Sequence, residues 1–349
     1  MSTRSTILDV ANRAGVGKVT VSYVLNGRAE AERISQATIE RVLRAAVELN
    51  YRPNAHARNL ATRKSNAIGV VFQYGEFFSH HSNFITEVLR AVCMACVEAD
   101  VDVTLHTRPS SDPMEEANFL SDGRVDAVIL IRDIDDPVHK LLLDRNFPAV
   151  LFFCRSDDPR AAFVSCDNYN GGRQAVNHLV GLGHRRIVML RGPEGSVDSN
   201  DRYHGYLSAL DSAEIPHDPS LVLADNDFTG LRQLIESDNP PTAAFTWSDD
   251  SAMDAILFLS ELGMSVPTDL SVVGFDGTAA GGRFQPSLTS VRQPIAEIAT
   301  AAVQLAIQLA ATAQEMDRHI TLAPQLITRE STAFLKNSKE FYDKEVNSQ

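Results

Sequence analysis

The sequence lacks the features that mark membrane-spanning, secreted and disulfide-rich proteins. It contains no run of about 18 uncharged apolar residues, so we expect no transmembrane helix. The first residues lead straight into Asp9, Asn12 and Arg13, without the apolar segment of a secretory signal. Four cysteines in 349 residues are too few for a disulfide scaffold. We therefore expect reduced thiols and a cytoplasmic protein without a membrane partner.

The motifs of common enzymes and cofactor-binding proteins are absent as well. The chain has no G-x-G-x-x-G or Walker sequence, and the glycine pair at 171–172 is only a faint likeness of a phosphate loop. It has no G-x-S-x-G nucleophile elbow. Cys93 and Cys96 lie within an apolar stretch, which favours small buried thiols over redox chemistry. The histidine pair at 80–81 has no partner cluster nearby in sequence. We expect no enzymatic activity, no cofactor and no bound metal.

What the sequence does have is a sharp division of charge. The composition, 44% hydrophobic and 22% charged, is that of a globular chain with a net charge of −13. Residues 1–64 hold eleven lysines and arginines against five acids, which gives +6, and the remainder holds 21 against 40, which gives −19. A basic segment on an acidic body predicts that a polyanion binds at the N-terminal end. On charge alone, chance surface charge is the alternative.

The first fifty residues predict three short helices. Thr6 and Asp9 have the spacing of a capping box, and apolar residues at helical spacing follow until Gly15, which favours a helix end. A second helix is predicted over 18–25, and a third follows Ser35 and runs to about residue 49. Two helices joined by a tight glycine turn are typical of the helix-turn-helix, whose second helix enters the major groove of DNA. An ordinary helical hairpin is the alternative from pattern alone.

The second predicted helix carries side chains suited to reading DNA. Lys18 can donate to guanine acceptors, and Val19 can pack on a thymine methyl group. Thr20, Ser22 and Tyr23 can reach phosphates or base edges.

Two segments of this region, ILDVANRAGV (7–16) and TVSYVLNG (20–27), resemble the DNA-binding headpiece of the lactose-repressor/galactose-repressor (LacI/GalR) family. Residues 48–60, ELNYRPNAHARNL, resemble that family's hinge. One departure is Gly17, where the family usually has a serine cap, although glycine caps a helix only slightly less well. The headpiece residues that the resemblance and the pattern assign to DNA are Thr6, Gly17, Lys18, Val19, Thr20, Ser22, Tyr23, Asn26 and Tyr51.

Residues 54–62 predict a short helix that needs a partner. Pro53 ends the third helix, and about nine residues are too few for a stable isolated helix in water. The resemblance implies that the same segment of a second subunit is the partner, in the minor groove, and that Leu60 wedges between base pairs and kinks the duplex. The side chains that would line the groove or the phosphates are Asn54, Ala57 and Arg58. Without the resemblance, a flexible basic linker is the preferred interpretation.

The rest of the chain alternates short apolar runs with helical patterns. This alternation predicts parallel sheets with helices on both faces, in two Rossmann-like subdomains with a cleft between them. Thr289–Val291 and a helix over 294–314 are expected to return to the first subdomain, and Gln325–Thr328 to the second. The core also resembles the periplasmic-binding-protein-like core of the same family. The supporting segments are 68–71, 182–187, 272–276, 290–294 and 328–332.

The predicted fold is thus an all-α helix-turn-helix headpiece followed by an α/β core of two Rossmann-like subdomains. The expected divisions are a headpiece over 1–52, a hinge over 53–65, a core over 66–335 and a polar tail over 336–349. Within the core, we expect an N-subdomain of about 66–165 and 292–322 and a C-subdomain of about 166–291 and 323–335.

A ligand of such a core is expected beyond the carboxyl ends of the strands. Asp276 directly follows a predicted strand, and its carboxylate can accept hydrogen bonds from hydroxyls or ring N–H groups. Arg202 opens a helix and offers a planar donor fork. The resemblance gives both residues effector-binding positions, whereas a surface salt bridge is the alternative.

Further candidates rest on position relative to the same family. Ser248 and Asp249 stand at a strand end where relatives have Asn-Asp, and Asp254 replaces a small residue without an evident reason. The remaining candidates are Tyr74, Phe77, Asn83, Phe153 and Phe228. For Tyr74, Phe77 and Phe228, packing in the core is the alternative.

Together these features predict a homodimeric transcription regulator of the repressor type. Each headpiece would read half of a pseudo-palindromic double-stranded operator, because two-fold protein symmetry matches two-fold DNA. A small-molecule effector in the cleft, a sugar or related metabolite, would control operator affinity. The alternative is a solute-binding protein or a sugar-processing enzyme on the same core. The basic N-terminal segment separates the two, since neither alternative requires it.

Overall fold

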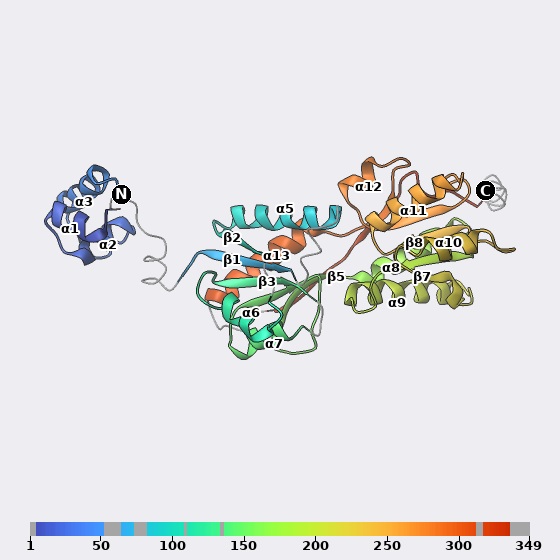
Figure 1. Cartoon of the computed structure of the whole chain (residues 1–349), viewed down its shortest axis with the longest axis horizontal. Coiled ribbons are helices and arrows are strands. Elements are labelled where there is room, and N and C mark those ends of the chain that lie inside the picture. Colours follow the sequence, from blue (N-terminus) through green and yellow to red (C-terminus); the bar gives the residue numbers. More distant parts are fainter. Residues whose placement is uncertain are drawn as a thin grey trace, which may run out of the picture. The chain divides into compact units, whose positions relative to one another are not determined.

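The computed structural model of the protein consists of two compact units, residues 1–65 and 66–349 (Figure 1). The structure describes residues 5–51, 64–72, 82–107, 110–132, 136–311 and 317–335. Several residues considered above lie outside these ranges: Asn54, Ala57, Arg58, Leu60, Tyr74, Phe77 and the histidines at 80–81.

Three helices form the first unit: α1 (Ile7–Ala14), α2 (Lys18–Leu25) and α3 (Gln36–Glu48). The predicted capping box is present, since the Asp9 amide donates to Thr6 Oγ1 (3.3 Å) and the Thr6 amide donates to Asp9 Oδ2 (2.8 Å). At the other end of α1, the chain turns through a left-handed conformation at a glycine with φ of 64°. The three predicted helices and their order are confirmed.

A small shared core holds these helices together. Val10, Ala11, Val21 and Val42 come from all three helices and are at most 3% exposed. A surface ion pair also joins α1 to α3, from Arg13 Nη2 to a Glu48 oxygen 2.8 Å away. An exposed pair of this kind contributes at most about 1 kcal/mol, so apolar burial supplies most of the stability of this unit.

The first sheet of the second unit has six parallel strands in the order β11-β5-β4-β3-β1-β2. The strands are β1 (Ala67–Phe72), β2 (Asp102–His106), β3 (Ala127–Ile131), β4 (Ala149–Phe152), β5 (Ala162–Cys166) and β11 (His319–Leu322).

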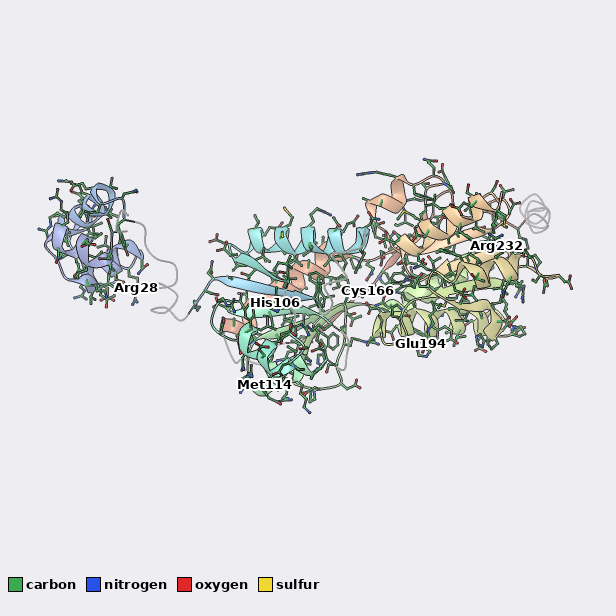
Figure 2. The ribbon with its side chains drawn as sticks, viewed as in Figure 1. Arg28, His106, Met114, Cys166, Glu194 and Arg232 are labelled. Carbon is green, nitrogen blue, oxygen red and sulfur yellow. The ribbon has the colours of Figure 1, made fainter. Side chains whose placement is uncertain are left out.

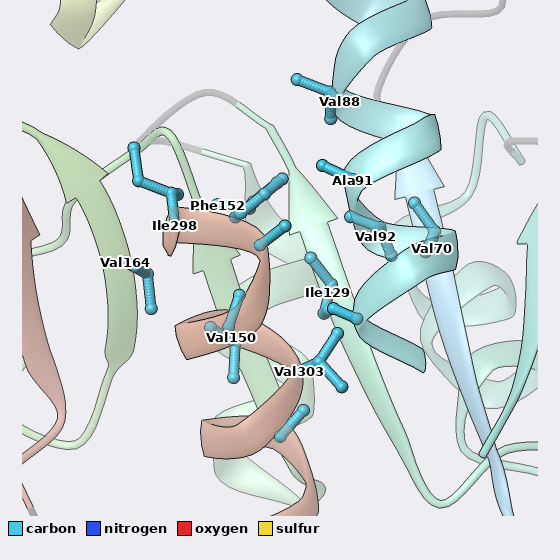
Figure 3. Packing of buried hydrophobic residues seen from close by; sticks show 14 of the residues in the cluster. Val70, Val88, Ala91, Val92, Ile129, Val150, Phe152, Val164, Ile298 and Val303 are labelled. Carbon is cyan, nitrogen blue, oxygen red and sulfur yellow. The ribbon is translucent and has the colours of Figure 1, made fainter. Parts of the chain in front are cut away.

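Helices cover both faces of this sheet (Figure 1). One buried cluster combines strand residues with α5 (Asn83–Glu98) and α13 (Ile295–Ala311), as Figure 3 shows. A second cluster combines the alternate strand residues with α6 (Pro113–Leu120) and α7 (Pro137–Asp144). The central strands are apolar along their whole length because both of their faces are buried.

The second sheet has the order β12-β10-β9-β8-β6-β7 and is parallel except for β12, which runs antiparallel to β10. The strands are β6 (Ile187–Arg191), β7 (Val222–Ala224), β8 (Ala243–Thr246), β9 (Ser271–Asp276), β10 (Thr289–Arg292) and β12 (Gln325–Ile327). One cluster of buried side chains involves α8 (Asn168–Gly181) and α9 (Val197–Ser212), and the other involves α10 (Phe228–Ile235) and α11 (Asp249–Glu261).

Two glycines allow α8 and α9 to lie in very close contact. A Cβ at Gly172 would lie 2.4 Å from the Arg202 carbonyl oxygen, and one at Gly205 would lie 2.2 Å from a carbonyl oxygen of α8. Neither distance is tolerable for a larger residue. The glycine at position 172 therefore serves helix packing rather than a phosphate loop, and the contact fixes the part of α9 that carries Arg202.

One expectation about chain order is wrong. The strand over Thr289–Val291 does not join the first subdomain, because β10 pairs with β9 (Thr289 opposite Val273) and with β12 in the second sheet. The helix that follows it does pack against the first sheet, as predicted. The chain therefore crosses between the sheets just after β10.

The cysteines and helices of the described ranges agree in part with the sequence-based expectations. Cys96 of α5 is buried, but Cys93 is exposed, so only one of the pair is a core thiol. Cys166 ends β5, at the point where the chain leaves the first sheet (Figure 2).

Within the described ranges, none of the helices has the length and apolar character that crossing a bilayer requires.

Candidate functional site

The exposed side of α2 gathers most of the residues predicted to contact DNA. Lys18 and Val19 are exposed, and Val19, at 62%, is unusually open for an apolar side chain. Thr20 is half-buried, whereas Val21 and Val24 face the core of the unit. The helix thus has one face held by packing and one face free to contact a partner.

Ser22, Tyr23 and Asn26 continue this exposed side. Asn26 Nδ2 donates to Ser22 Oγ (3.2 Å), and the Arg28 guanidinium lies 5.4 Å from the centre of the Tyr23 ring. Gly17 is the N-cap of α2 and makes no side-chain hydrogen bond, and a Cβ there would meet open space.

The two remaining headpiece candidates lie elsewhere on the unit. Thr6 is exposed at the start of α1, where its side chain is already engaged with the Asp9 carboxylate. Tyr51 is half-buried and packs against the small core. The expected hinge contacts lie beyond the described residues.

The second unit contains a cavity of about 480 Å³, and residues from both of its sheets line this cavity. The first sheet contributes residues from the ends of β3 and β4, including Phe152 and Phe153. The second contributes residues from the ends of β8 and β9, including Trp247 and Asp276. This is the carboxyl edge of both sheets, where ligands of open α/β folds bind.

Arg202 of α9 is the central cation of the cavity and is only 3% exposed. Its Nε donates to Asn168 Oδ1 (2.9 Å), its Nη1 donates to the Trp247 carbonyl oxygen, and its guanidinium lies over the Phe275 ring at 3.7 Å. These contacts hold the guanidinium rigidly. Its Nη1 lies 3.9 Å from Asp276 Oδ1, which brings together two residues predicted from sequence.

Asp276 ends β9 in a strained conformation, with φ of 112°. Gln293 Nε2 donates to its Oδ1 (2.8 Å). Burial raises the pKa of this carboxyl well above its usual value, and the nearby Arg202 opposes that shift. Strain of this kind persists only where the surroundings enforce it, and it gathers at ligand sites.

Phe153 lines the cavity from the opposite side and is also strained, with φ of 57°. It follows β4 directly, and its ring meets Phe84 edge to face with the ring centres 5.1 Å apart. The strained residues of the two sheets thus lie at the ends of strands that lead into the same cavity.

Ser248 and Asp249 differ in what they can do. Ser248 lines the cavity and caps α11, accepting a hydrogen bond from the Ser251 amide (3.1 Å). Asp249 does not line it, and its carboxylate accepts hydrogen bonds from Thr278, just after β9, and from Ser290 of β10. Burial raises the pKa of Asp249 to about 6. The expectation that Asp249 contacts an effector is therefore not supported by its placement.

Phe228 and Asn83 also lie outside the cavity lining. Phe228 stacks on Phe258 with the ring centres 4.9 Å apart, within the apolar cluster beneath α10 and α11, so the core-packing alternative describes it. Asn83 begins α5, and its Nδ2 donates to Asp250 Oδ1 (2.6 Å) across the cleft. Asn83 is therefore one contact removed from a ligand, through a residue that does line the cavity.

The cavity also includes residues that sequence reasoning did not select. The charged ones, together with one amide, are Arg132, Asp198, Asp225, Asn226, Asp250 and Asp254. Most of them follow the ends of parallel strands or begin the next helix, which was a usable signal. Asp198 accepts a hydrogen bond from Asn168 Nδ2 (2.9 Å), and burial raises its pKa to about 7.

Comparison with known families gives two matches along the chain. The family described as bacterial regulatory proteins, lacI family, matches residues 6–54. The periplasmic binding protein-like domain matches residues 176–332. The first match covers the three helices of the first unit, and the second covers all six strands of the second sheet.

Curated relatives match over nearly the whole chain. A protein of Bacillus subtilis (strain 168) named probable HTH-type transcriptional repressor ExuR is 31% identical over 93% of this chain and 98% of its own length. The HTH-type transcriptional regulator CelR of Thermobifida fusca is 34% identical over 83% of this chain and 87% of its own length.

Solved structures show the same architecture. A CelR–cellobiose complex superposes with a TM-score of 0.70 at 30% identity and covers 94% of this chain and all of its own. The Lac repressor dimer bound to operator and the anti-inducer ONPF superposes with a TM-score of 0.81 at 27% identity, over 95% of this chain and all of its own. The predicted helix-turn-helix headpiece and two-subdomain α/β core are confirmed.

Proposed function

The chain belongs to the LacI family of bacterial regulatory proteins, and we propose that it represses transcription by binding a two-fold operator with an affinity that a metabolite in the core cavity controls. One observation carries the proposal: a single chain combines an exposed, basic helix-turn-helix surface with a cavity between two sheets whose apolar lining carries several charged groups. The first is suited to DNA and the second to a small ligand.

We assign direct base contacts to the exposed side of α2. Lys18 and Val19 stand at its start, where a recognition helix meets base edges. The positively charged surroundings supply the attraction to phosphate that dominates affinity. The complete set assigned to DNA in this unit is Thr6, Gly17, Lys18, Val19, Thr20, Ser22, Tyr23, Asn26 and Tyr51.

The hinge is assigned to the minor groove. Leu60 is the apolar wedge, and Asn54, Ala57 and Arg58 line the groove or the phosphates. Support comes from the sequence of residues 48–60 and from the length of the segment, which is too short for a stable helix without a partner.

The effector is assigned to the cavity, with Arg202 and Asp276 as its principal polar contacts. Ser248 and Phe153 line the same space. Asn83 acts through Asp250, and Tyr74 and Phe77 remain candidates on the strength of sequence alone. A cavity of about 480 Å³ suits a mono- or disaccharide. The cellobiose and ONPF bound by the two solved relatives support a sugar or glycoside.

Two chains form the functional regulator in this proposal. Large apolar side chains are exposed together on α5 and on the edge strand β2: Met94, Val97, Val103 and Leu105. An unpaired edge strand beside apolar residues is a surface that proteins usually cover. A homodimer through this surface would place two headpieces on one two-fold operator.

The remaining assignments follow from the role of a regulator. We assign residues 53–65 to the hinge, about 66–165 and 292–322 to the N-subdomain, and about 166–291 and 323–335 to the C-subdomain. The protein acts in the cytoplasm, where its DNA is, and it binds its ligand without converting it.

A competition experiment tests this function. Purified full-length protein is mixed with labelled genomic fragments and excess random DNA at moderate salt, with and without a library of sugars and nucleosides. We expect a few fragments to be retained selectively and at least one metabolite to change that retention. Binding to all fragments alike, whatever is added, would contradict the proposal.

A further inference from the structure

The lining of the cavity is unusually acidic. Five of its residues are aspartates, and its only cations among the described residues are two arginines. The aspartates are Asp198, Asp225, Asp250, Asp254 and Asp276. A ligand therefore enters a space lined by more acidic than basic side chains.

Both arginines already have acidic neighbours within the protein. Arg132 is 7% exposed, and it pairs with Asp136 (2.7 Å) and with Glu116, neither of which lines the cavity. Arg202 faces Asp276, with 3.9 Å between Nη1 and Oδ1. Neither guanidinium is free to pair with an acidic ligand without losing a buried partner, which would be costly.

Three of the aspartates form one side of the cavity, here called the acidic wall: Asp225, Asp250 and Asp254. Asp225 follows β7, and the other two lie four residues apart at the start of α11. Asp250 lies in the first turn of the helix, where a carboxylate is favourable, but a second carboxylate four residues later repels it, so helix stability does not account for Asp254.

The neighbours of the acidic wall do not cancel its charge. Asp225 accepts a hydrogen bond from the Ser251 hydroxyl, and Asp250 accepts two from Asn83, whose amide and side chain are both neutral. Burial raises the pKa of Asp254, and the charges of Asp250 and Asp225 add to that shift. Asp254, which the sequence left without a role, thus lies within electrostatic reach of Asp250 and Asp225.

We propose that the acidic wall sets a charge rule for the effector: the cavity accepts a neutral or cationic sugar and rejects the uronate or phosphorylated form of the same sugar. This inference rests on the proposed function, because it takes the cavity as the effector site. It goes further by naming Asp225, Asp250 and Asp254 as specificity-determining residues. Hydroxyl and ammonium groups can donate to carboxylates, whereas a carboxylate or phosphate ligand can only be repelled by them.

Matched ligands test the rule on the full-length protein. The panel contains glucose, glucosamine, glucuronate and glucose 6-phosphate, the corresponding galactose series, and cellobiose with cellobionate. Trp247 is the chain's only tryptophan and lines the cavity, so its fluorescence reports binding directly. We expect the neutral or amino member of at least one series to bind at least about tenfold more tightly than its acidic counterpart.

Variants show whether the acidic wall is the cause. Asp225→Asn combined with Asp254→Asn should reduce the discrimination against acids at least about threefold while neutral sugars still bind. Asp238→Asn is the matched control, because it removes one exposed carboxylate that does not line the cavity. It should leave the discrimination unchanged.

Several results would overturn the rule. They are an acid that binds the wild type as tightly as its neutral counterpart, a double variant with unchanged discrimination, and a panel in which no sugar binds. Operator retention is measured in the same preparations. Its loss would contradict the proposed function, whereas intact operator binding with a failed charge rule would contradict only this inference.

Discussion

The two units of the molecule build their binding surfaces in opposite ways. In the first unit, the candidate contacts come from one stretch of 46 residues, between Thr6 and Tyr51, and most of them lie on or directly beside the short helix α2 of a basic segment. In the second unit, Phe153, Arg202 and Asp276 come from distant parts of an acidic chain and meet only through the fold. A local surface can be predicted from local pattern, whereas an assembled cavity requires the topology.

The largest effect that would test this contrast concerns Arg202. Replacing it by alanine leaves Asp198 and Asp276 buried without their nearest cation, and we expect the free energy of unfolding of the second unit to fall by about 3–5 kcal/mol. Urea unfolding followed by Trp247 fluorescence measures this unit alone, since the first contains no tryptophan.

The control for that experiment is Arg186→Ala. Arg186 pairs with Asp218 at 2.9 Å, but both side chains are partly exposed, so the loss should stay within about 1 kcal/mol. Equal losses in the two variants would mean that Arg202 does not stabilise the buried carboxylates.

The second largest effect is expected for DNA binding by the first unit. Lys18→Ala should weaken operator binding by about tenfold, because one good base contact is worth about 1–3 kcal/mol. The unfolding of the second unit should not change. Fluorescence anisotropy with labelled operator measures the affinity, and Arg44→Ala, an exposed basic residue of α3, is the control for simple charge loss. If both variants lose affinity alike, Lys18 does not read bases.

Much of the fold was predictable from the sequence because its signals are local. The capping pair Thr6 and Asp9 and the turn at Gly15 set the bounds of α1, and apolar periodicity located α2 and α3. Strand partners were less predictable. Residues 289–292 lie between two sheets in the chain, and only their pairing with β9 and β12 decides which sheet they join.

The side chains that line the cavity were as hard to predict from the sequence as the strand partners. Asp249 and Asp250 are neighbours in sequence at the start of α11, yet the first is held by Thr278 and Ser290 while the second lines the cavity. Nothing in the local pattern separates them, because the choice depends on loops far along the chain. Phe228 is similar, since its stacking on Phe258 is a packing outcome.

A smaller effect follows from the pKa of Asp198, which burial raises to about 7. A carboxyl whose pKa is higher in the folded state stabilises the fold at low pH, and this contribution is lost as pH rises towards and through 7. Asp198→Asn should therefore be more stable than the wild type at pH 8, by about 1 kcal/mol or more, and should lose that advantage near pH 4. Thermal melting of both proteins across this range would detect stability curves that converge at low pH.

The first unit should show the opposite dependence. The pKa of Asp9 is lowered by its hydrogen bonds to Thr6, so the stabilising contribution of Asp9 is present at neutral pH and is lost under acid conditions.

For the Asp198 experiment, an advantage of Asp198→Asn that does not vary with pH would mean that the Asp198 carboxyl has the same pKa in the folded and unfolded states.

The smallest expected effect is at Gly17. A serine side chain at this position would meet open space, and its hydroxyl oxygen could accept a hydrogen bond from a free amide of α2. Gly17→Ser should therefore stabilise the first unit by a few tenths of a kcal/mol, about the usual difference between these caps. Circular dichroism of the full-length protein during melting follows the helices, and Gly27→Ser is the control, because its φ of 71° disfavours serine. Equal effects at both positions would contradict a capping explanation.

Control of the headpiece by the cavity is tested most directly when operator affinity and sugar binding are measured in one experiment. Operator affinity is determined by anisotropy for the wild type and for Asp276→Asn while a sugar that changes Trp247 fluorescence is added. If the cavity controls the headpiece, the sugar changes the wild-type affinity by about 5–150-fold, the usual range of allosteric coupling, and Asp276→Asn keeps the sugar-free affinity but no longer responds. A variant that responds as strongly as the wild type would show that the cavity does not control the headpiece through this residue.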